Sequence, residues 1–240
     1  MLQNRFTMEM AGLKIEVDTI SPRTCILCRD YLSECIPDIK VKIREEDIEQ
    51  EKKGVDSVEN KEIFIETIAA YRKIIDVAVD YDVFLMHGAV VATNEQAFMF
   101  TAPSGTGKTT HVKQWLKNDK KSYIVNGDKP LIKITNEDAF ACGTPWSGNE
   151  HMNTNSMVPL KAIVLMERNE TNHIEAISFA HAYRFLIQQT YIPSNVEKAQ
   201  KTLNLLTRLG KIVSFYKFQF NNFSDDCFTI AYQALVGKES

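Results

Sequence analysis

At 240 residues with 44% hydrophobic side chains, the chain is long enough for one sizeable domain, or for a domain with a modest additional layer. Its net charge of -3, with acidic and basic residues mixed throughout, excludes an extended basic surface for nucleic acid or anionic lipid. No apolar run approaches the roughly 18 to 20 residues that cross a bilayer, and the N-terminus lacks the pattern of a secretory signal. We therefore expect a globular cytoplasmic protein without nucleic-acid or membrane partners.

The five cysteines are an odd number in a chain too large to need disulfide staples, which favours reduced thiols. Cys25 and Cys28 form a C-x-x-C pair, with Cys35 nearby, and such a pair can hold zinc or carry out redox chemistry. Because no second Cys or His pair follows at the required spacing, we expect buried or incidental thiols on a helix instead of a metal site.

The N-terminal segment alternates apolar and polar residues over positions 6–20, which predicts a hairpin or a pair of strands. Pro22 then opens a predicted helix over residues 23–34, and a strand over 39–43 and a charged helix follow. The polar turn that comes next is the best candidate for a boundary. We therefore divide the chain into an α+β layer, 1–56, and a larger part, 57–240.

A long helix is predicted from residue 57 to residue 80, because its apolar positions recur at spacings of three and four. Those positions are Phe64, Ile68, Tyr71, Ile75 and Ala78. The chain then enters residues 83–92 and 96–102, which are apolar nearly throughout, as strands buried on both faces should be.

Further short apolar runs predict strands at 122–125, 131–134, 139–142, 161–166 and 211–220. A helix is predicted over 194–210, with Ser194 and Glu197 in capping-box positions and Gly210 at its C-terminal end. Ser224 can cap a closing helix. This order of elements predicts an α/β fold with a mixed sheet and helices packed on it.

Residues 102–109, APSGTGKT, lie between a predicted strand and a predicted helix, which is the context of a phosphate-binding loop. In such a loop successive backbone N–H groups converge on phosphate oxygens at a helix N-terminus. Lys108 supplies a positive charge to the β and γ phosphates, and the Thr109 hydroxyl is a ligand for Mg²⁺. Ala102 replaces the usual first glycine, a position that mainly makes the turn. We predict nucleotide binding here.

Two carboxylates compete for the role of the second acid of the site. Asp128 follows a predicted strand and two turn-forming residues, so it can approach Mg²⁺ or a substrate hydroxyl. Glu167 follows five apolar residues, a pattern that an ATPase uses to activate water. Spacing does not decide between them, because either strand can neighbour the strand of the loop.

Three other segments bear on function. His87 lies at a predicted strand end beside Gly88, which permits close backbone approach, and its chemistry suits a site that handles protons or phosphate charge. Residues 142–155 are rich in Gly, Asn and Thr and carry a tryptophan, which is typical of a binding loop. The letters NGDK at 126–129 are in the wrong order for guanine recognition, so we discount a GTPase.

Taken in order, the segments HGAVV, APSGTGKTT, NGDKP, GTPWSG and PLKAIVLMER resemble the HPr kinase/phosphorylase and PEP carboxykinase type of P-loop protein. The resemblance covers roughly residues 84 to 220 and is nearest to small HPr-kinase-like proteins. It implies a mixed-sheet P-loop kinase fold of the PEP carboxykinase/HPr kinase C-terminal type, with ATP and Mg²⁺ as cofactors. HPr kinases assemble, so a homo-oligomer is compatible with it.

The resemblance also implies roles for individual residues. Asp128 matches the general base, which also contacts the metal with Thr109, and His87 matches the histidine that faces the transferring phosphate. The residues implied to bind the nucleotide are Ser104, Gly105, Thr106, Gly107, Lys108, Thr109 and Thr110. The loop implied to stand near the acceptor comprises Gly143, Thr144, Pro145, Trp146, Ser147 and Gly148.

Two positions depart from the pattern of that family. Gly127 stands where its first acid would be, and Glu150 lies close to, but out of register with, its acidic metal ligand. We predict an ATP-dependent kinase whose acceptor is a serine-like hydroxyl of a small molecule, peptide or carrier protein. The alternatives are a nucleotide-binding regulatory module and an ATPase that uses Glu167; the chain is too short for a PEP carboxykinase proper.

Overall fold

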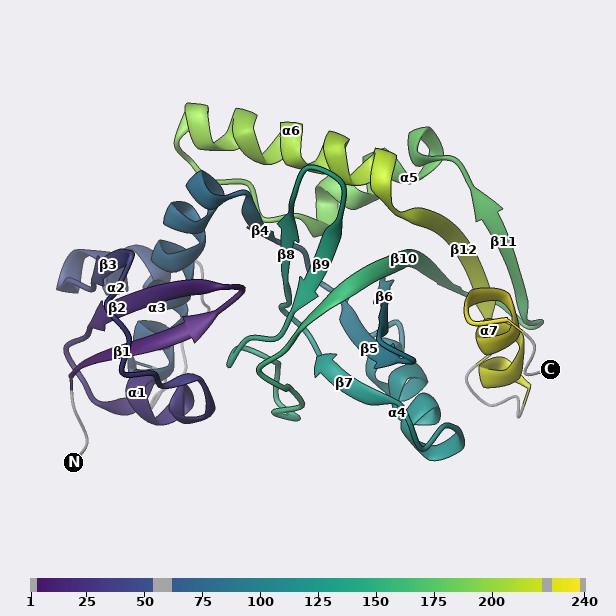
Figure 1. The fold of residues 1–240 in the computed structure, drawn as a ribbon, viewed down its shortest axis with the longest axis horizontal. Coiled ribbons are helices and arrows are strands. Elements are labelled where there is room, and N and C mark those ends of the chain that lie inside the picture. The colour runs from purple at the N-terminus through teal and green to yellow at the C-terminus, as the bar shows by residue number, and fades with distance from the viewer. Residues whose placement is uncertain (1–3, 54–61, 222–225, 238–240) are drawn as a thin grey trace. The chain divides into compact units, whose positions relative to one another are not determined.

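The computed structural model describes residues 4–53, 62–221 and 226–237, and its chain forms two compact units, Met1–Tyr81 and Asp82–Ser240 (Figure 1). Both units combine helices and strands, so the protein is mixed α/β. The division falls after the long helix α3 (Glu62–Ala78), whereas the sequence analysis placed it before that helix. The reason is that α3 packs on the helices and the sheet of the first unit.

The first unit contains a three-stranded sheet. Strands β1 (Arg5–Met10) and β2 (Leu13–Asp18) form the predicted antiparallel hairpin, and β3 (Ile39–Lys42) runs parallel to β2. The turn between β1 and β2 is made by Ala11 and Gly12, both with positive φ, 53° and 66°. This is the backbone that a two-residue hairpin with right-handed twist requires.

The helices of the first unit are α1 (Arg23–Leu27), the short 3-10 helix η1 (Arg29–Tyr31), α2 (Glu45–Lys52), α3 and η2 (Val79–Tyr81). The single helix predicted over 23–34 is therefore wrong, because the chain leaves helical geometry at Cys28. Cys25 and Cys28 are buried free thiols, and no group of His, Cys, Asp and Glu suited to a metal ion occurs in the described part of the chain.

The second unit is built on a curled mixed sheet of nine strands. Its order is β4-β8-β9-β10-β6-β5-β7, and β12 pairs with both β10 and β11. The strands are β4 (Val83–Leu85), β5 (Ala89–Thr93), β6 (Gln96–Thr101), β7 (Tyr123–Asn126), β8 (Leu131–Ile134), β9 (Ala139–Cys142), β10 (Met157–Arg168), β11 (His173–Ile177) and β12 (Ser214–Phe220).

Strand β10 joins the two parts of this sheet. Its first residues, Met157–Pro159, pair antiparallel with β9, and its later residues run parallel to β6 on one side and to β12 on the other. A register shift between Leu160 and Ala162 marks the transition. Because one long strand belongs to both parts, the sheet curls along β10.

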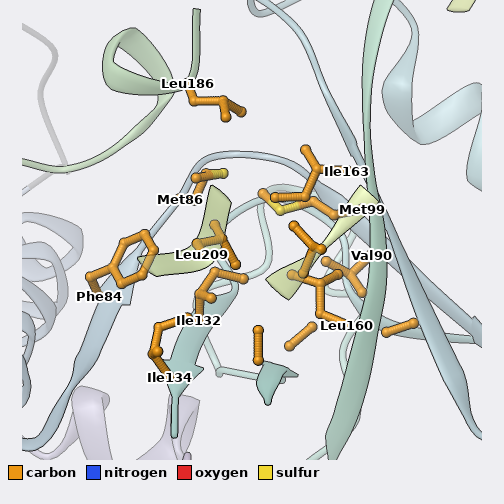
Figure 2. Packing of buried hydrophobic residues seen from close by; sticks show 14 of the residues in the cluster. Phe84, Met86, Val90, Met99, Ile132, Ile134, Leu160, Ile163, Leu186 and Leu209 are labelled. Atoms are coloured by element: carbon orange, nitrogen blue, oxygen red, sulfur yellow. The ribbon is translucent and has the colours of Figure 1, made fainter. Parts of the chain in front are cut away.

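Helices cover both faces of the part of the sheet that carries β5 and β6. Alternate residues of β6 point to opposite sides: Phe98 and Phe100 pack on α4 (Lys108–Asn118) and α7 (Cys227–Leu235), whereas Met99 faces α5 (Phe179–Gln189) and α6 (Val196–Ile212). Figure 1 shows these helices around the sheet. Figure 2 shows buried hydrophobic side chains on the side of the sheet that α5 and α6 cover, Met99 among them. No helix in the described residues has the length and apolar character needed to span a membrane.

The strand directions gather several chain segments at one edge of the sheet. Strands β6, β7, β10 and β12 run the same way, since β5 is antiparallel to both β6 and β7, and β10 is parallel to β6 and β12. Their carboxyl ends therefore lie at the same edge, where β5 begins. Open α/β sheets bind ligands at this edge.

Several predicted element bounds need correction. The predicted strand 83–92 is two strands, β4 and β5, because the chain crosses between different places in the sheet at residues 86–88. Helix α6 is capped by the side chain of Asn195, not Ser194, and Gly210 lies inside it, where a Cβ would meet the ring of Phe179. Strand β11 and helix α5 were not predicted, and Ser224 lies outside the described residues.

Candidate active site

The segment between β6 and α4, where a phosphate-binding loop is predicted, is a tight turn that contains two glycines with positive φ. Gly105 has φ +76°, and Gly107, the residue that caps α4, has φ +117°; L side chains rarely adopt either angle. The hydroxyl of Thr106 donates to the carbonyl of Pro103 at 2.8 Å and closes the loop. The helix N-terminus thus follows directly on a glycine-shaped turn, which is the arrangement that binds phosphate.

Lys108 points its ammonium group back into this loop. Its Nζ donates to the carbonyls of Ala102 at 2.8 Å and Pro103 at 3.3 Å. Burial lowers the pKa of Lys108, and the charge of Asp128 opposes that shift. Ala102 is fully buried in the core cluster with α4 and is accommodated in place of the usual glycine.

Arg168, the last residue of β10, binds the backbone of the loop at Gly105 and Thr106. Its Nε donates to the carbonyl of Thr106 at 2.8 Å and its Nη2 donates to the carbonyl of Gly105 at 2.8 Å. The planar guanidinium is suited to such a paired contact. This residue was not predicted from the sequence, and the available signal was its place at the end of a predicted strand, after Glu167.

His87 and Asp128 form a pair across the same edge. The Nε2 atom of His87 lies 3.0 Å from Oδ1 of Asp128, and its Nδ1 lies 3.0 Å from Oε1 of Gln189, the last residue of α5. Hydrogen bonding from His87 lowers the pKa of Asp128 below its ordinary value, and burial opposes that shift. Asp128 is therefore an ionised carboxylate at neutral pH, with an imidazole beside it.

The backbone around Asp128 and His87 is fixed by a network of buried polar groups. The side chain of Asn126 accepts from the backbone N–H of Asp128 at 2.9 Å and donates to the carbonyl of Thr144. The N–H of Gly88 donates to the carbonyl of Asp128 at 2.9 Å, and the N–H of His87 donates to the carbonyl of Gln189 at 2.7 Å. A Cβ on Gly88 would lie 2.9 Å from the carbonyl oxygen of Phe100, so glycine permits this close crossing.

The loop from Gly143 to Gly148 packs against Asp128. Thr144, Trp146 and Ser147 are buried, and Gly148 approaches Asp128 so closely that a Cβ on it would lie 3.2 Å from that of Asp128. The position of this loop beside the acceptor stays a prediction. Its observed contacts are with residues 126–129, which include Asp128.

These groups surround one pocket of about 550 Å³. It is lined by His87, Ser104, Gly105, Gly107, Lys108, Thr109, Thr110, Gly127, Asp128 and Arg168. All three predicted catalytic residues and most of the predicted nucleotide-binding residues thus meet there. Thr106 is occupied in closing the loop.

Glu167 and Glu150 point elsewhere. Although β10 neighbours β6 directly, the Glu167 carboxylate accepts from Nζ of Lys217 on β12 at 2.8 Å, and this bond lowers its pKa. Glu150 forms an ion pair with Lys113 on α4. The acid that lines the phosphate pocket is Asp128.

Gly127 lies in the pocket wall where the resemblance expects an acid. A Cβ at this position would lie 3.2 Å from the carbonyl oxygen of Ser147 and 3.4 Å from that of Met152. Its N–H donates to the carbonyl of Met152 at 2.9 Å. Any side chain at residue 127 would therefore require the backbone at Ser147 to shift by a few tenths of an ångström.

The donor set of the pocket fits Mg²⁺ bound together with phosphates. Thr109 offers a hydroxyl and Asp128 a carboxylate, both of them oxygen donors. Mg²⁺ in nucleotide sites is commonly held by one or two protein oxygens, with phosphate and water supplying the rest. The pair is adequate for that mode of binding.

No family model and no curated protein matches the chain. Among solved structures, the HPr(Ser) kinase/phosphatase from Coxiella burnetii is similar to it with a TM-score of 0.35 and 12% sequence identity. The similarity covers 63% of this chain and 93% of that protein.

Proposed function

We propose that the protein is an ATP-dependent kinase that transfers the γ-phosphate to a serine-like hydroxyl of a small molecule, peptide or carrier protein. The observation that carries this proposal is that the Asp128–His87 pair and Lys108 line one pocket at a glycine-shaped helix N-terminus. A phosphate cradle and an ionised carboxylate in one pocket are what in-line transfer to a hydroxyl requires.

In the proposed reaction Asp128 accepts the proton of the acceptor hydroxyl. The acceptor oxygen forms a bond to the γ-phosphorus, and the bond from that phosphorus to the bridging oxygen breaks, which leaves ADP. His87, held by Gln189 through Nδ1, contacts the Asp128 carboxylate through Nε2 and so orients it. A positioned base of this kind contributes about 10²- to 10⁴-fold to the rate.

The loop residues supply charge and position. The ammonium of Lys108 exchanges its contacts with two loop carbonyls for contacts with phosphate oxygens. Arg168 keeps the loop crest in place while this exchange occurs. When bound through Thr109 and Asp128, Mg²⁺ would neutralise phosphate charge.

A second candidate is a nucleotide-binding regulatory module with little or no transfer. Gly127 favours it, because the pocket has one carboxylate where the resemblance expects a pair. Binding of ATP is common to both candidates. Only the fate of the γ-phosphate separates them.

The test is incubation of the protein with Mg²⁺ and γ-labelled ATP in the presence of serine, serine peptides and small carrier proteins. We expect label on at least one acceptor, and loss of that label in Lys108→Ala. Label on no acceptor, without release of phosphate but with ATP binding that depends on Lys108, would establish the regulatory module. Phosphate release that is independent of any acceptor would establish an ATPase.

A further inference from the structure

A second and larger pocket, of about 900 Å³, adjoins the phosphate pocket. It lies on the side of the sheet covered by α5, and its walls are apolar: Leu165 on β10, Ile177 on β11 and Phe185 on α5. Polar groups at its margin come from Glu167, Glu175 and Lys217. A concave, mainly apolar site with a few polar groups is typical of a ligand pocket of this volume.

The two pockets meet through consecutive residues of the same segments. Pro103 lines the larger pocket, and the next residue, Ser104, lines the phosphate pocket. In the same way, Glu167 lines the larger pocket and Arg168 lines the phosphate pocket. The two pockets therefore lie at the same two chain segments, the start of the phosphate loop and the end of β10.

Residues of helix α5 connect the larger pocket with the His87 end of the phosphate pocket. Phe185 and Gln189 are four residues apart and thus lie on the same face of the helix. Phe185 lines the larger pocket, and Gln189 holds the imidazole of His87 beside Asp128. The larger pocket is therefore lined one helical turn before Gln189, the residue that holds His87 beside the proposed base Asp128.

The margin of the larger pocket is acidic. Lys217 donates to Glu167 at 2.8 Å, and the charge of Glu175 adds to the effect of Glu167 in raising the pKa of Lys217. The margin thus carries two carboxylates, Glu167 and Glu175, and one ammonium, while His181 on α5 is hydrogen-bonded to Ser178. The excess of negative charge favours a ligand with a positive group near its apolar part.

We infer that this pocket binds a peptide acceptor, in which the phosphorylated serine or threonine has a large apolar neighbour in the sequence and a basic residue close by. The apolar side chain would lie among Leu165, Ile177 and Phe185, and the basic residue would lie near Glu175. A pocket of this size suits a peptide segment better than free serine. This inference rests on the proposed kinase function.

The test uses the full chain, Mg²⁺, γ-labelled ATP and a library of short peptides with one central serine and varied flanking residues. We expect labelling to concentrate on peptides with a Leu, Ile, Met or Phe beside the serine and a Lys or Arg nearby. Phe185→Ala should raise KM for such a peptide by about tenfold, because the apolar side chain loses its partner. Tyr183→Ala, on the same helix but outside both pockets, is the matched control for folding.

A charge exchange tests the acidic margin independently. Glu175→Lys should lower the preference for a basic residue by about threefold and improve use of the same peptide with Glu in that place. Glu137→Lys makes the same change of charge outside both pockets and should leave the preference unchanged.

The outcomes separate this inference from the proposed function. Even labelling of the library, or labelling of small hydroxyl compounds without any peptide, would overturn the peptide pocket and leave the kinase standing. If Phe185→Ala instead weakens ATP binding by about the same factor, the pocket holds the nucleoside and the inference is wrong. If neither peptides nor small hydroxyl compounds are labelled, the proposed kinase function is wrong, and this inference is wrong with it.

Discussion

The imidazole of His87 lies between two oxygens, Oδ1 of Asp128 and Oε1 of Gln189, at 3.0 Å from each. The three residues come from the β4–β5 crossing, the end of β7 and the end of α5. A doubly protonated ring can donate to both oxygens, whereas a neutral ring that donates to Asp128 needs the Gln189 amide turned so that its NH2 group faces Nδ1. In either form the contacts fix the ring plane and the orientation of the carboxylate.

Asp128→Asn is expected to lower the rate of transfer by about 10²- to 10⁴-fold while ATP binding stays nearly intact. The amide keeps the size of the carboxylate but cannot accept the proton of the acceptor. Single-turnover transfer and equilibrium ATP binding are the two measurements. Unchanged turnover would remove Asp128 as the base and return Glu167 to consideration.

The pH dependence of the wild-type protein follows from the same contacts. Because His87 lowers the pKa of Asp128, the carboxylate remains ionised to below its ordinary value of 3.8. The stabilisation from this pairing is present above pH 3.8 and is lost as the pH falls through the lower value in the folded state. Protonation of Asp128 should therefore stop phosphate transfer only at a pH below the ordinary pKa of a carboxyl group.

Gln189→Leu should lower kcat by up to about tenfold and leave KM for ATP unchanged. The substitution removes the hydrogen bond to the His87 ring, and a bond of this kind is worth about 1 kcal/mol. Gln188→Leu, at an exposed neighbouring position of α5, is the matched control. An equal effect of both variants on kcat would show that α5, and not the bond to His87, is responsible.

Arg168→Ala is expected to weaken ATP binding by about tenfold, because two carbonyls of the loop lose their donors. Arg168→Lys should restore only part of the affinity, since an ammonium cannot make the paired contact of a guanidinium. Calorimetric titration with an ATP analogue is the measurement. Full affinity in the alanine variant would show that the loop keeps its shape without this clamp.

The turn before α4 could be predicted from sequence because its shape depends on consecutive residues. Glycines with positive φ, the lysine and the following helix are local features, and the structure places them together as expected. Asp128 and Glu167 could not be separated in this way. The choice depends on which way each side chain points from its strand end, and Lys217, which pairs with Glu167, is fifty residues further along the chain.

The roles of Gln189 and Arg168 were not predictable for the same physical reason. Helix α5 was missed altogether, and the contact of its last residue with His87 joins positions 102 residues apart. Arg168 contacts the loop across 63 residues of chain. Such contacts follow from the curled sheet, whose strand order is set by burial and pairing and not by a local pattern.

His111 is a fully buried histidine one turn into α4, away from the pocket. The indole N–H of Trp115 donates to its Nε2 at 3.2 Å, and the sulfur of Cys227 on α7 lies 3.5 Å from its Nδ1. The rings of Phe100 and Phe218 pack around it. Because this environment is apolar, burial lowers the pKa of His111 from 6.5 to about 3.

His111 should therefore make the fold sensitive to acid. Its pKa is lower in the folded state, so the unfolded chain binds more protons between pH 6.5 and about 3, and stability falls as the pH falls through this range. At pH 5 the loss relative to neutral pH amounts to about 2 kcal/mol. His111→Gln keeps an acceptor for Trp115 but does not titrate. In urea unfolding between pH 7 and pH 5, this variant should lose less stability than the wild type, whereas exposed His173→Gln should follow the wild type. Parallel stability curves for the wild type and His111→Gln would show that the buried imidazole is not the source of acid sensitivity.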